Sequence, residues 1–179
     1  MQALRAEECA HVAKGLLTAR GGFAPAWPAF ARKSVAFGYT SRLANAEDVG
    51  AVLAAVFPTS DRVLFWTHGL VWGDRTRDPT ASADWRAYGD WRAKRGISQS
   101  LHERPGLLFA PGESDLLASA IAWTLLTGSE ALAIDNRRHS AIQLSHDDCV
   151  ILRLRTRLPK LGAALIKLGL RRLSSIPGE

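Results

Sequence analysis

Histidines and carboxylates are the most reactive side chains in this chain. His102 and Glu103 precede a Pro-Gly turn, His146 and Asp147 follow a short apolar run, and His68 follows another. Such groups can bind a divalent metal ion or exchange protons with a substrate. However, no two histidines have the spacing that places two ligands on one helix face. Adjacent residues of a strand also point to opposite sides. A metal-dependent hydrolase thus remains only an alternative hypothesis, with His102, Glu103, His146 and Asp147 as its candidate residues. We predict no bound metal or cofactor.

Other catalytic patterns are missing from the sequence. The run Ser145-His146-Asp147 is not a catalytic triad, because triad residues converge in space and not along the chain. The glycines form neither a GxxxxGK[ST] nor a GxGxxG phosphate-binding pattern. We therefore favour a protein that is not an enzyme.

Tryptophan and arginine gather in one part of the chain, at Trp66, Trp72, Trp85, Trp91, Arg86, Arg92 and Arg95. These residue types are the usual anchors of protein interfaces. The alternative is a hydrophobic core, which we favour for the group as a whole because tryptophans are buried on average. We expect Trp91 to be the exception, since charged residues flank it. The candidate partner-binding residues of this region are Trp85, Trp91, Arg92 and Arg95.

The excess positive charge lies entirely in the last 31 residues. Residues 1–148 contain 16 Lys/Arg and 16 Asp/Glu, whereas residues 149–179 contain seven Lys/Arg and one Glu. We therefore predict a charge-balanced body and a basic C-terminal segment that is part of the same domain or packed on it. Basic segments attract nucleic acid, anionic membranes or acidic proteins.

The basic segment has two patterns. Arg153, Arg155 and Arg157 alternate with apolar residues, which predicts a strand with one apolar and one basic face. After Pro159 the spacing is helical and ends at Arg171 and Arg172. The five arginines are candidates for contact with a partner or with nucleic acid. The alternative is an edge strand whose charges discourage aggregation. No aromatic residue accompanies them, which argues against stacking on single-stranded bases.

Apolar periodicity and turn residues outline the elements. Helices are predicted at residues 3–18, 46–57, 84–95 and 114–127, with Asn45 as a cap of the second. Strands are predicted at 34–40, 61–66, 107–110, 131–134, 141–144 and 149–158. Their irregular order favours α+β over a doubly wound sheet. We expect a single domain with a mixed or antiparallel sheet, three to four packed helices and a basic C-terminal strand-helix extension.

Composition suggests a cytoplasmic bacterial protein. The chain has 47% hydrophobic residues, no run of 18 apolar residues and no signal-peptide core near its start. Its two cysteines, Cys9 and Cys149, are far apart, so a reduced protein is the simple expectation and one long-range disulfide the alternative.

Residues 63–148 contain several short motifs, including Leu64-Phe65-Trp66, Leu101-His102-Glu103-x-Pro105-Gly106 and Ser145-His146-Asp147-Asp148. With Val71-Trp72, Phe109 and Glu113-x-Asp115-Leu116, these motifs resemble a group of small bacterial proteins with no assigned activity. In size and fold class the chain is also similar to bacterial immunity proteins, but this resemblance assigns no residue roles. We expect a protein partner first, nucleic acid second and a membrane surface third.

Overall fold

The computed structural model describes residues 1–13, 33–40, 43–57, 61–69, 73–137, 140–154 and 159–175. Their strands are β1 (Gln2–Leu4), β2 (Lys33–Gly38), β3 (Val63–Gly69), β4 (Gly106–Phe109), β5 (Glu130–Asp135), β6 (Ser140–Ser145), β7 (Cys149–Leu154) and β8 (Arg171–Arg172). Their helices are α1 (Ala6–Ala13), α2 (Ala46–Ala54), α3 (Ala83–Ala93), α4 (Ser114–Thr127) and α5 (Pro159–Lys167).

The eight strands form one open sheet in the order β1-β4-β3-β5-β6-β7-β2-β8. Every neighbouring pair is antiparallel. The α+β prediction is therefore confirmed, and of the two predicted kinds of sheet the antiparallel one is found. None of the described helices is long and apolar enough to cross a membrane.

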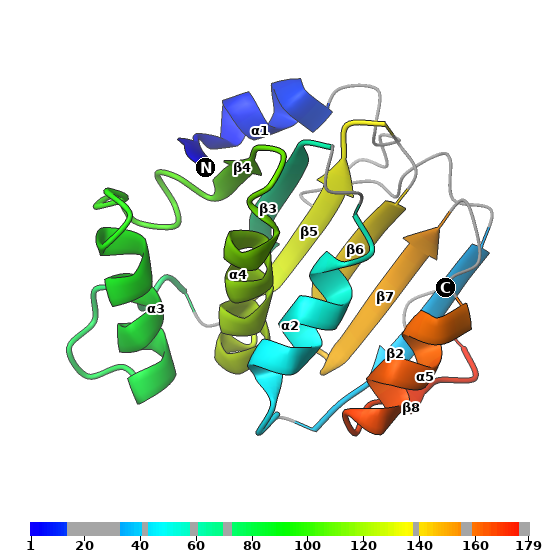
Figure 1. Cartoon of the computed structure of the whole chain (residues 1–179). Coiled ribbons are helices and arrows are strands. Elements are labelled where there is room, and N and C mark those ends of the chain that lie inside the picture. Colours follow the sequence, from blue (N-terminus) through cyan, green and yellow to red (C-terminus); the bar gives the residue numbers. More distant parts are fainter. Residues whose placement is uncertain are drawn as a thin grey trace.

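The sheet buries both of its faces. Because strand side chains alternate, Val63 and Phe65 of β3 point to one face and Leu64 points to the other. Figure 1 shows α4, α2 and α5 across the first face, where the larger core lies. On the second face, α1 packs Cys9 and Ala13 into a smaller core with Leu64.

Close contact between α2 and α4 depends on Gly50. A Cβ at this position would overlap with the carbonyl oxygen of Ala118 in α4. The neighbouring α4 residues Ile121 and Leu125 are buried in the same core. Gly128 ends α4 in a left-handed conformation with φ of 64°, as the sequence predicts for a C-terminal glycine.

The aromatic residues of α3 are core residues. Trp85, Tyr88 and Trp91 are all buried, and the ring of Tyr88 stacks on that of Trp123 in α4 at a centroid distance of 6.4 Å. The core interpretation is confirmed for Trp85 and Trp91. The expectation that Trp91 is an exception is wrong, because only 7% of it is exposed. Trp72 lies outside the described residues.

The N-terminal region differs from its prediction. Residues 2–4 form a strand rather than the start of a helix, and β1 pairs with β4 at the outer edge of the sheet. Its neighbour α1 covers residues 6–13, and residues 14–18 of the predicted helix lie outside the described residues. Cys9 and Cys149 are both free and buried, so they form no disulfide with each other.

The C-terminal residues belong to the sheet and its helix layer, so a separate strand-helix extension is not confirmed. Strand β7 lies inside the sheet between β6 and β2, which contradicts an edge position. Both faces of β7 are buried, and Arg153 is only 8% exposed. Its guanidinium donates a hydrogen bond to Ser34 Oγ in β2 at 3.1 Å. Arg155 and Arg157 lie outside the described residues.

Helix α5 is attached to the rest of the molecule through α2. Asn45, predicted to cap α2, makes no side-chain capping bond there. Its side-chain nitrogen instead donates to the carbonyl oxygen of Leu168 at 3.1 Å, just beyond the end of α5. Leu165 and Leu170 are buried in the main core. After α5 the chain adds β8 beside β2, at the edge of the sheet opposite β1. No strand was predicted at these residues.

Candidate functional site

A basic surface formed by α5 and β8 is the main exposed feature of the C-terminal region. Its four cations are Lys160, Lys167, Arg171 and Arg172, and all four are exposed. We call this group the α5–β8 surface, in which Arg171 and Arg172 point to opposite sides of the sheet edge because they are neighbours in a strand. Figure 1 shows α5 and β8 next to each other at one end of the sheet. No ion pair among the described residues involves these four side chains.

An apolar side chain accompanies the four cations. Ile166 in α5 is 54% exposed, and it is the large hydrophobic residue that the described part of the chain leaves open to solvent. The opposite side of α5 buries Leu165 against the core. Gly169 follows the helix with φ of 89°, a conformation that favours glycine, and it allows the chain to turn back toward β2. The amphipathic spacing of α5 thus explains why the basic side is exposed.

The predicted Trp/Arg surface lies inside the protein except for Arg95. Arg92 is 1% exposed, and its Nη2 donates to the carbonyl oxygens of Gln99 at 3.3 Å and Arg104 at 3.0 Å. Arg95 is exposed, and its guanidinium covers the ring of Trp91 at 4.3 Å. Arg92 and the two tryptophans therefore stabilise the α3 region and offer little area to a partner.

Asp74 lies within the electrostatic influence of Arg92 and is held by several hydrogen bonds. Although burial opposes its charge, hydrogen bonds from Thr76 and from the Leu101 N–H, together with the Arg92 charge, lower the pKa of Asp74. Thr76 donates through its backbone N–H at 2.9 Å and through its hydroxyl at 2.6 Å. The ionised carboxylate thus ties the loop before α3 to the loop before β4.

A second cluster lies where β3, β5 and β6 meet. Glu130 stands between two histidines: its Oε1 is 2.6 Å from Nδ1 of His146, and its Oε2 is 3.9 Å from Nδ1 of His68. The side chain of His68 is only 7% exposed. Burial lowers the pKa of His68, and the opposite effect of Glu130 is smaller. Sequence reasoning missed Glu130, although its place directly before the strand predicted at 131–134 could have indicated it.

The turn between β6 and β7 places no activated nucleophile beside His146. The hydroxyl of Ser145 lies 3.3 Å from Oδ2 of Asp147 and accepts the Asp147 N–H at 3.2 Å. Burial raises the pKa of the Cys149 thiol, so this sulfur is protonated at neutral pH. The hydrogen bonds of the Ser-His-Asp run are those of a turn, with Ser145 facing Asp147.

His102 and Glu103 do not join His146 and Asp147. Glu103 accepts hydrogen bonds from the N–H and hydroxyl of Ser100, both at 2.9 Å, and the first of these is the main reason why its pKa is lowered. These two candidates precede β4, whereas His146 follows β6, and β3 and β5 lie between. Three strand spacings amount to roughly 14 Å. Among the described residues, no three of His, Cys, Asp or Glu are arranged to hold a metal ion.

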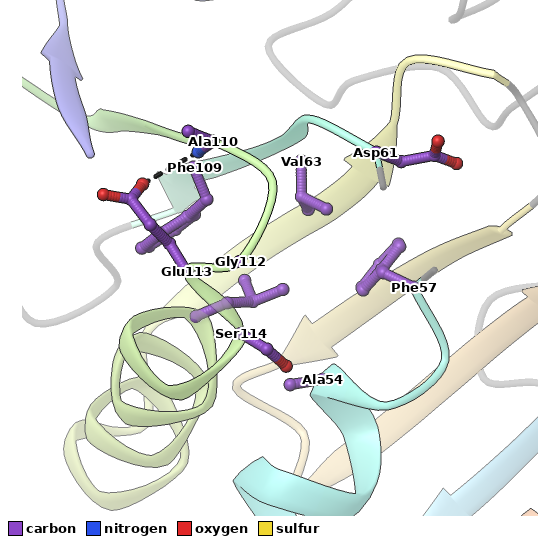
Figure 2. Close-up of a pocket in the computed structure, with 10 residues that line it drawn as sticks. Ala54, Phe57, Asp61, Val63, Phe109, Ala110, Gly112, Glu113 and Ser114 are labelled. Carbon is purple, nitrogen blue, oxygen red and sulfur yellow. Dashed lines mark hydrogen bonds between the residues drawn. The ribbon is translucent and has the colours of Figure 1, made fainter. Parts of the chain in front are cut away.

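A shallow hollow lies between the end of α2 and the start of α4 (Figure 2). Its volume, counted out to the open solvent, is about 270 Å³. The residues that line it include Ala54, Phe57, Val63, Phe109 and Leu117. The two carboxylates at its rim already have partners. Glu113 accepts the Ala110 N–H at 2.8 Å and pairs with the N-terminal ammonium, and Asp61 pairs with Arg137 at 2.7 Å. The hollow is smaller than usual ligand pockets.

Comparison with known proteins gives no relative. The chain matches no family model, no curated protein and no solved structure. The resemblance of residues 63–148 to small bacterial proteins therefore stays a prediction. What the fold defines is an α+β protein with an open antiparallel sheet.

Proposed function

We propose that this chain is a binding protein that contacts an acidic protein partner through the α5–β8 surface. The observation that carries the proposal is the group of four exposed cations, none of them in an ion pair with a described residue, together with the exposed side chain of Ile166 in α5. Unpaired surface charge accelerates encounter with an oppositely charged partner, and an exposed apolar residue adds contact that excludes water.

A protein partner fits this surface better than nucleic acid does. The nucleic-acid hypothesis used five arginines, Arg153, Arg155, Arg157, Arg171 and Arg172. Of these, Arg153 is buried and donates a hydrogen bond to Ser34. The exposed cations are confined to one short helix and a two-residue strand. The exposed isoleucine of the same helix, Ile166, gains more from an apolar partner side chain than from a phosphate backbone. The hydrolase hypothesis loses support because the pair His102 and Glu103 lies apart from the pair His146 and Asp147.

Charge reversal tests the proposed surface. The full chain, a K160E/K167E/R171E/R172E variant and an R62E/K94E control would be immobilised and exposed to nuclease-treated host lysate. The control replaces two exposed cations outside the α5–β8 surface. We expect an acidic protein to be retained by the chain and the control, to be lost with the four-fold variant, and to elute as salt rises. Equal retention by all three would refute the proposal, and retention only without nuclease would favour nucleic acid.

A further inference from the structure

Two serines follow β8 directly. Ser174 and Ser175 are both exposed, and they come immediately after Leu173. Arg171 and Arg172 therefore stand three and two residues before Ser174, and both arginine side chains are exposed. Serine kinases that select basic substrates recognise this spacing, because their carboxylates pair with arginines on the N-terminal side of the acceptor hydroxyl.

We propose that Ser174 is a phosphorylation site for a kinase that reads Arg171 and Arg172, and that its phosphorylation weakens binding at the α5–β8 surface. The second part rests on the proposed function. In the reaction, Ser174 Oγ attacks the γ-phosphorus of ATP and forms a new O–P bond. The bond from that phosphorus to the β,γ-bridging oxygen breaks, ADP leaves, and the hydroxyl proton passes to a base of the kinase.

The segment is held in a form that a kinase can reach. Strand β8 is already extended, is the outermost strand of the described sheet, and pairs with β2 over two residues only. Leu173 fixes its end: its N–H donates to Ala36 O at 2.9 Å, and its half-buried side chain lies against Gly38. So short a pairing opens locally at little cost, which lets the kinase bind the arginines and the serine together.

A phosphate at Ser174 would change the charge of the surface strongly. A phosphoserine carries about −1.5 to −2 charges at neutral pH, against the four positive charges of the α5–β8 surface. It also offers oxygens that form charge-assisted hydrogen bonds with arginine, and the nearest arginines are Arg171 and Arg172. The modification would therefore remove about half of the net charge of the α5–β8 surface.

Ser175 provides a matched control. It is exposed like Ser174 and adjacent to it, but the two arginines stand four and three residues before it. A kinase that selects the spacing of Ser174 should distinguish the two hydroxyls, whereas nonspecific transfer to any exposed serine should not.

The folded full chain would be incubated with ATP and a serine kinase selective for Arg-Arg-x-Ser, and the modified residue identified by mass spectrometry. We expect one phosphoryl group on Ser174, none there in S174A and an unchanged rate in S175A. For R171A/R172A we expect a loss of about tenfold or more. A synthetic peptide of residues 167–175 controls for kinase activity. If the peptide is modified but the folded chain is not, or if the phosphate is found on Ser175, the proposal is overturned.

Binding of immobilised polyglutamate then tests the switch. The unmodified chain should bind at low salt, and the chain phosphorylated at Ser174 should bind about tenfold more weakly. S174A treated with kinase should bind like the unmodified chain. Equal binding before and after phosphorylation would refute the switch, whereas failure of the unmodified chain to bind would instead refute the proposed basic contact surface.

Discussion

The buried imidazole of His68 lies beside the partly exposed carboxylate of Glu130, with 3.9 Å between Nδ1 and Oε2. Glu130 is at the same time 2.6 Å from the more exposed His146. One carboxylate thus faces two imidazoles at different depths. Glu130 is closer to His146, which is also more exposed to water, so its negative charge compensates little for the burial of His68.

This relationship predicts a loss of stability in mild acid. The pKa of His68 is lowered below its ordinary value of 6.5 by burial, so between pH 6.5 and the lower folded-state pKa the unfolded chain binds more protons. The free energy of unfolding therefore contains the full contribution of neutral His68 above pH 6.5. This contribution is lost as pH falls from 6.5 through the folded-state pKa.

Urea unfolding from pH 5 to pH 8 measures this effect. Replacing His68 with Gln should make the free energy of unfolding less dependent on pH in this range, because Gln takes up no proton. H102Q, which replaces an exposed histidine, is the control that separates the effect of burial at residue 68 from the loss of any histidine. An identical pH dependence in the unchanged chain and in H68Q would contradict the assigned burial effect.

Glycine positions on α2 and α5 should respond in opposite ways to alanine. At Gly50 a Cβ would meet the carbonyl oxygen of Ala118, and backbone cannot move aside easily. G50A should therefore lower the free energy of unfolding by about 1–3 kcal/mol. At Gly162 a Cβ would meet only Phe37 Cζ at 3.5 Å, an ordinary contact. Because alanine is the better helix former, G162A should raise the free energy of unfolding by up to about 1 kcal/mol. Urea unfolding decides the sign at each position, and stabilisation by G50A would contradict the described packing of α2 on α4.

Arg92 should be far more important for stability than its neighbour Arg95. Removing the buried guanidinium takes away the hydrogen bonds to Gln99 O and Arg104 O and the charge beside Asp74. R92A should therefore cost about 3 kcal/mol or more. R95A removes an exposed side chain and should cost about 1 kcal/mol or less. Thermal and urea unfolding of both variants provide the measurement, and equal effects would contradict a structural role for Arg92.

Local patterns in the sequence predicted most of the elements, because they depend on neighbouring residues. Gly128 and the apolar run before it predicted the end of α4, and the β-branched and aromatic residues around Phe65, bounded by turn residues, predicted β3. The order of strands depends on contacts far apart in sequence. The burial of Arg153 depends on β2 lying beside β7, which no residue near Arg153 indicates.

Contacts between residues far apart in sequence also decide which candidate site residues meet. Glu130 and His146 are 16 residues apart and meet only because β5 and β6 pair as neighbouring strands. His102 looked equivalent to His146 in sequence, since both stand beside a carboxylate. The sheet order separates the two, and this order could not be derived from periodicity. Charge, by contrast, was informative: the basic C-terminal segment does provide the exposed cations of α5 and β8.

The two cysteines should be unreactive in the folded protein. Burial raises the pKa of Cys9 to about 12 and also raises that of Cys149, so neither thiol forms much of the reactive thiolate at neutral pH. We expect a thiol reagent at pH 7.5 to label neither residue in the folded chain and both in denaturant. Because both thiols are free, added reductant should leave the unfolding temperature unchanged. Rapid labelling of the folded chain would contradict the burial of Cys9 in α1 or of Cys149 in β7. Labelling of the single variants C9A and C149A would identify which of the two cysteines is exposed.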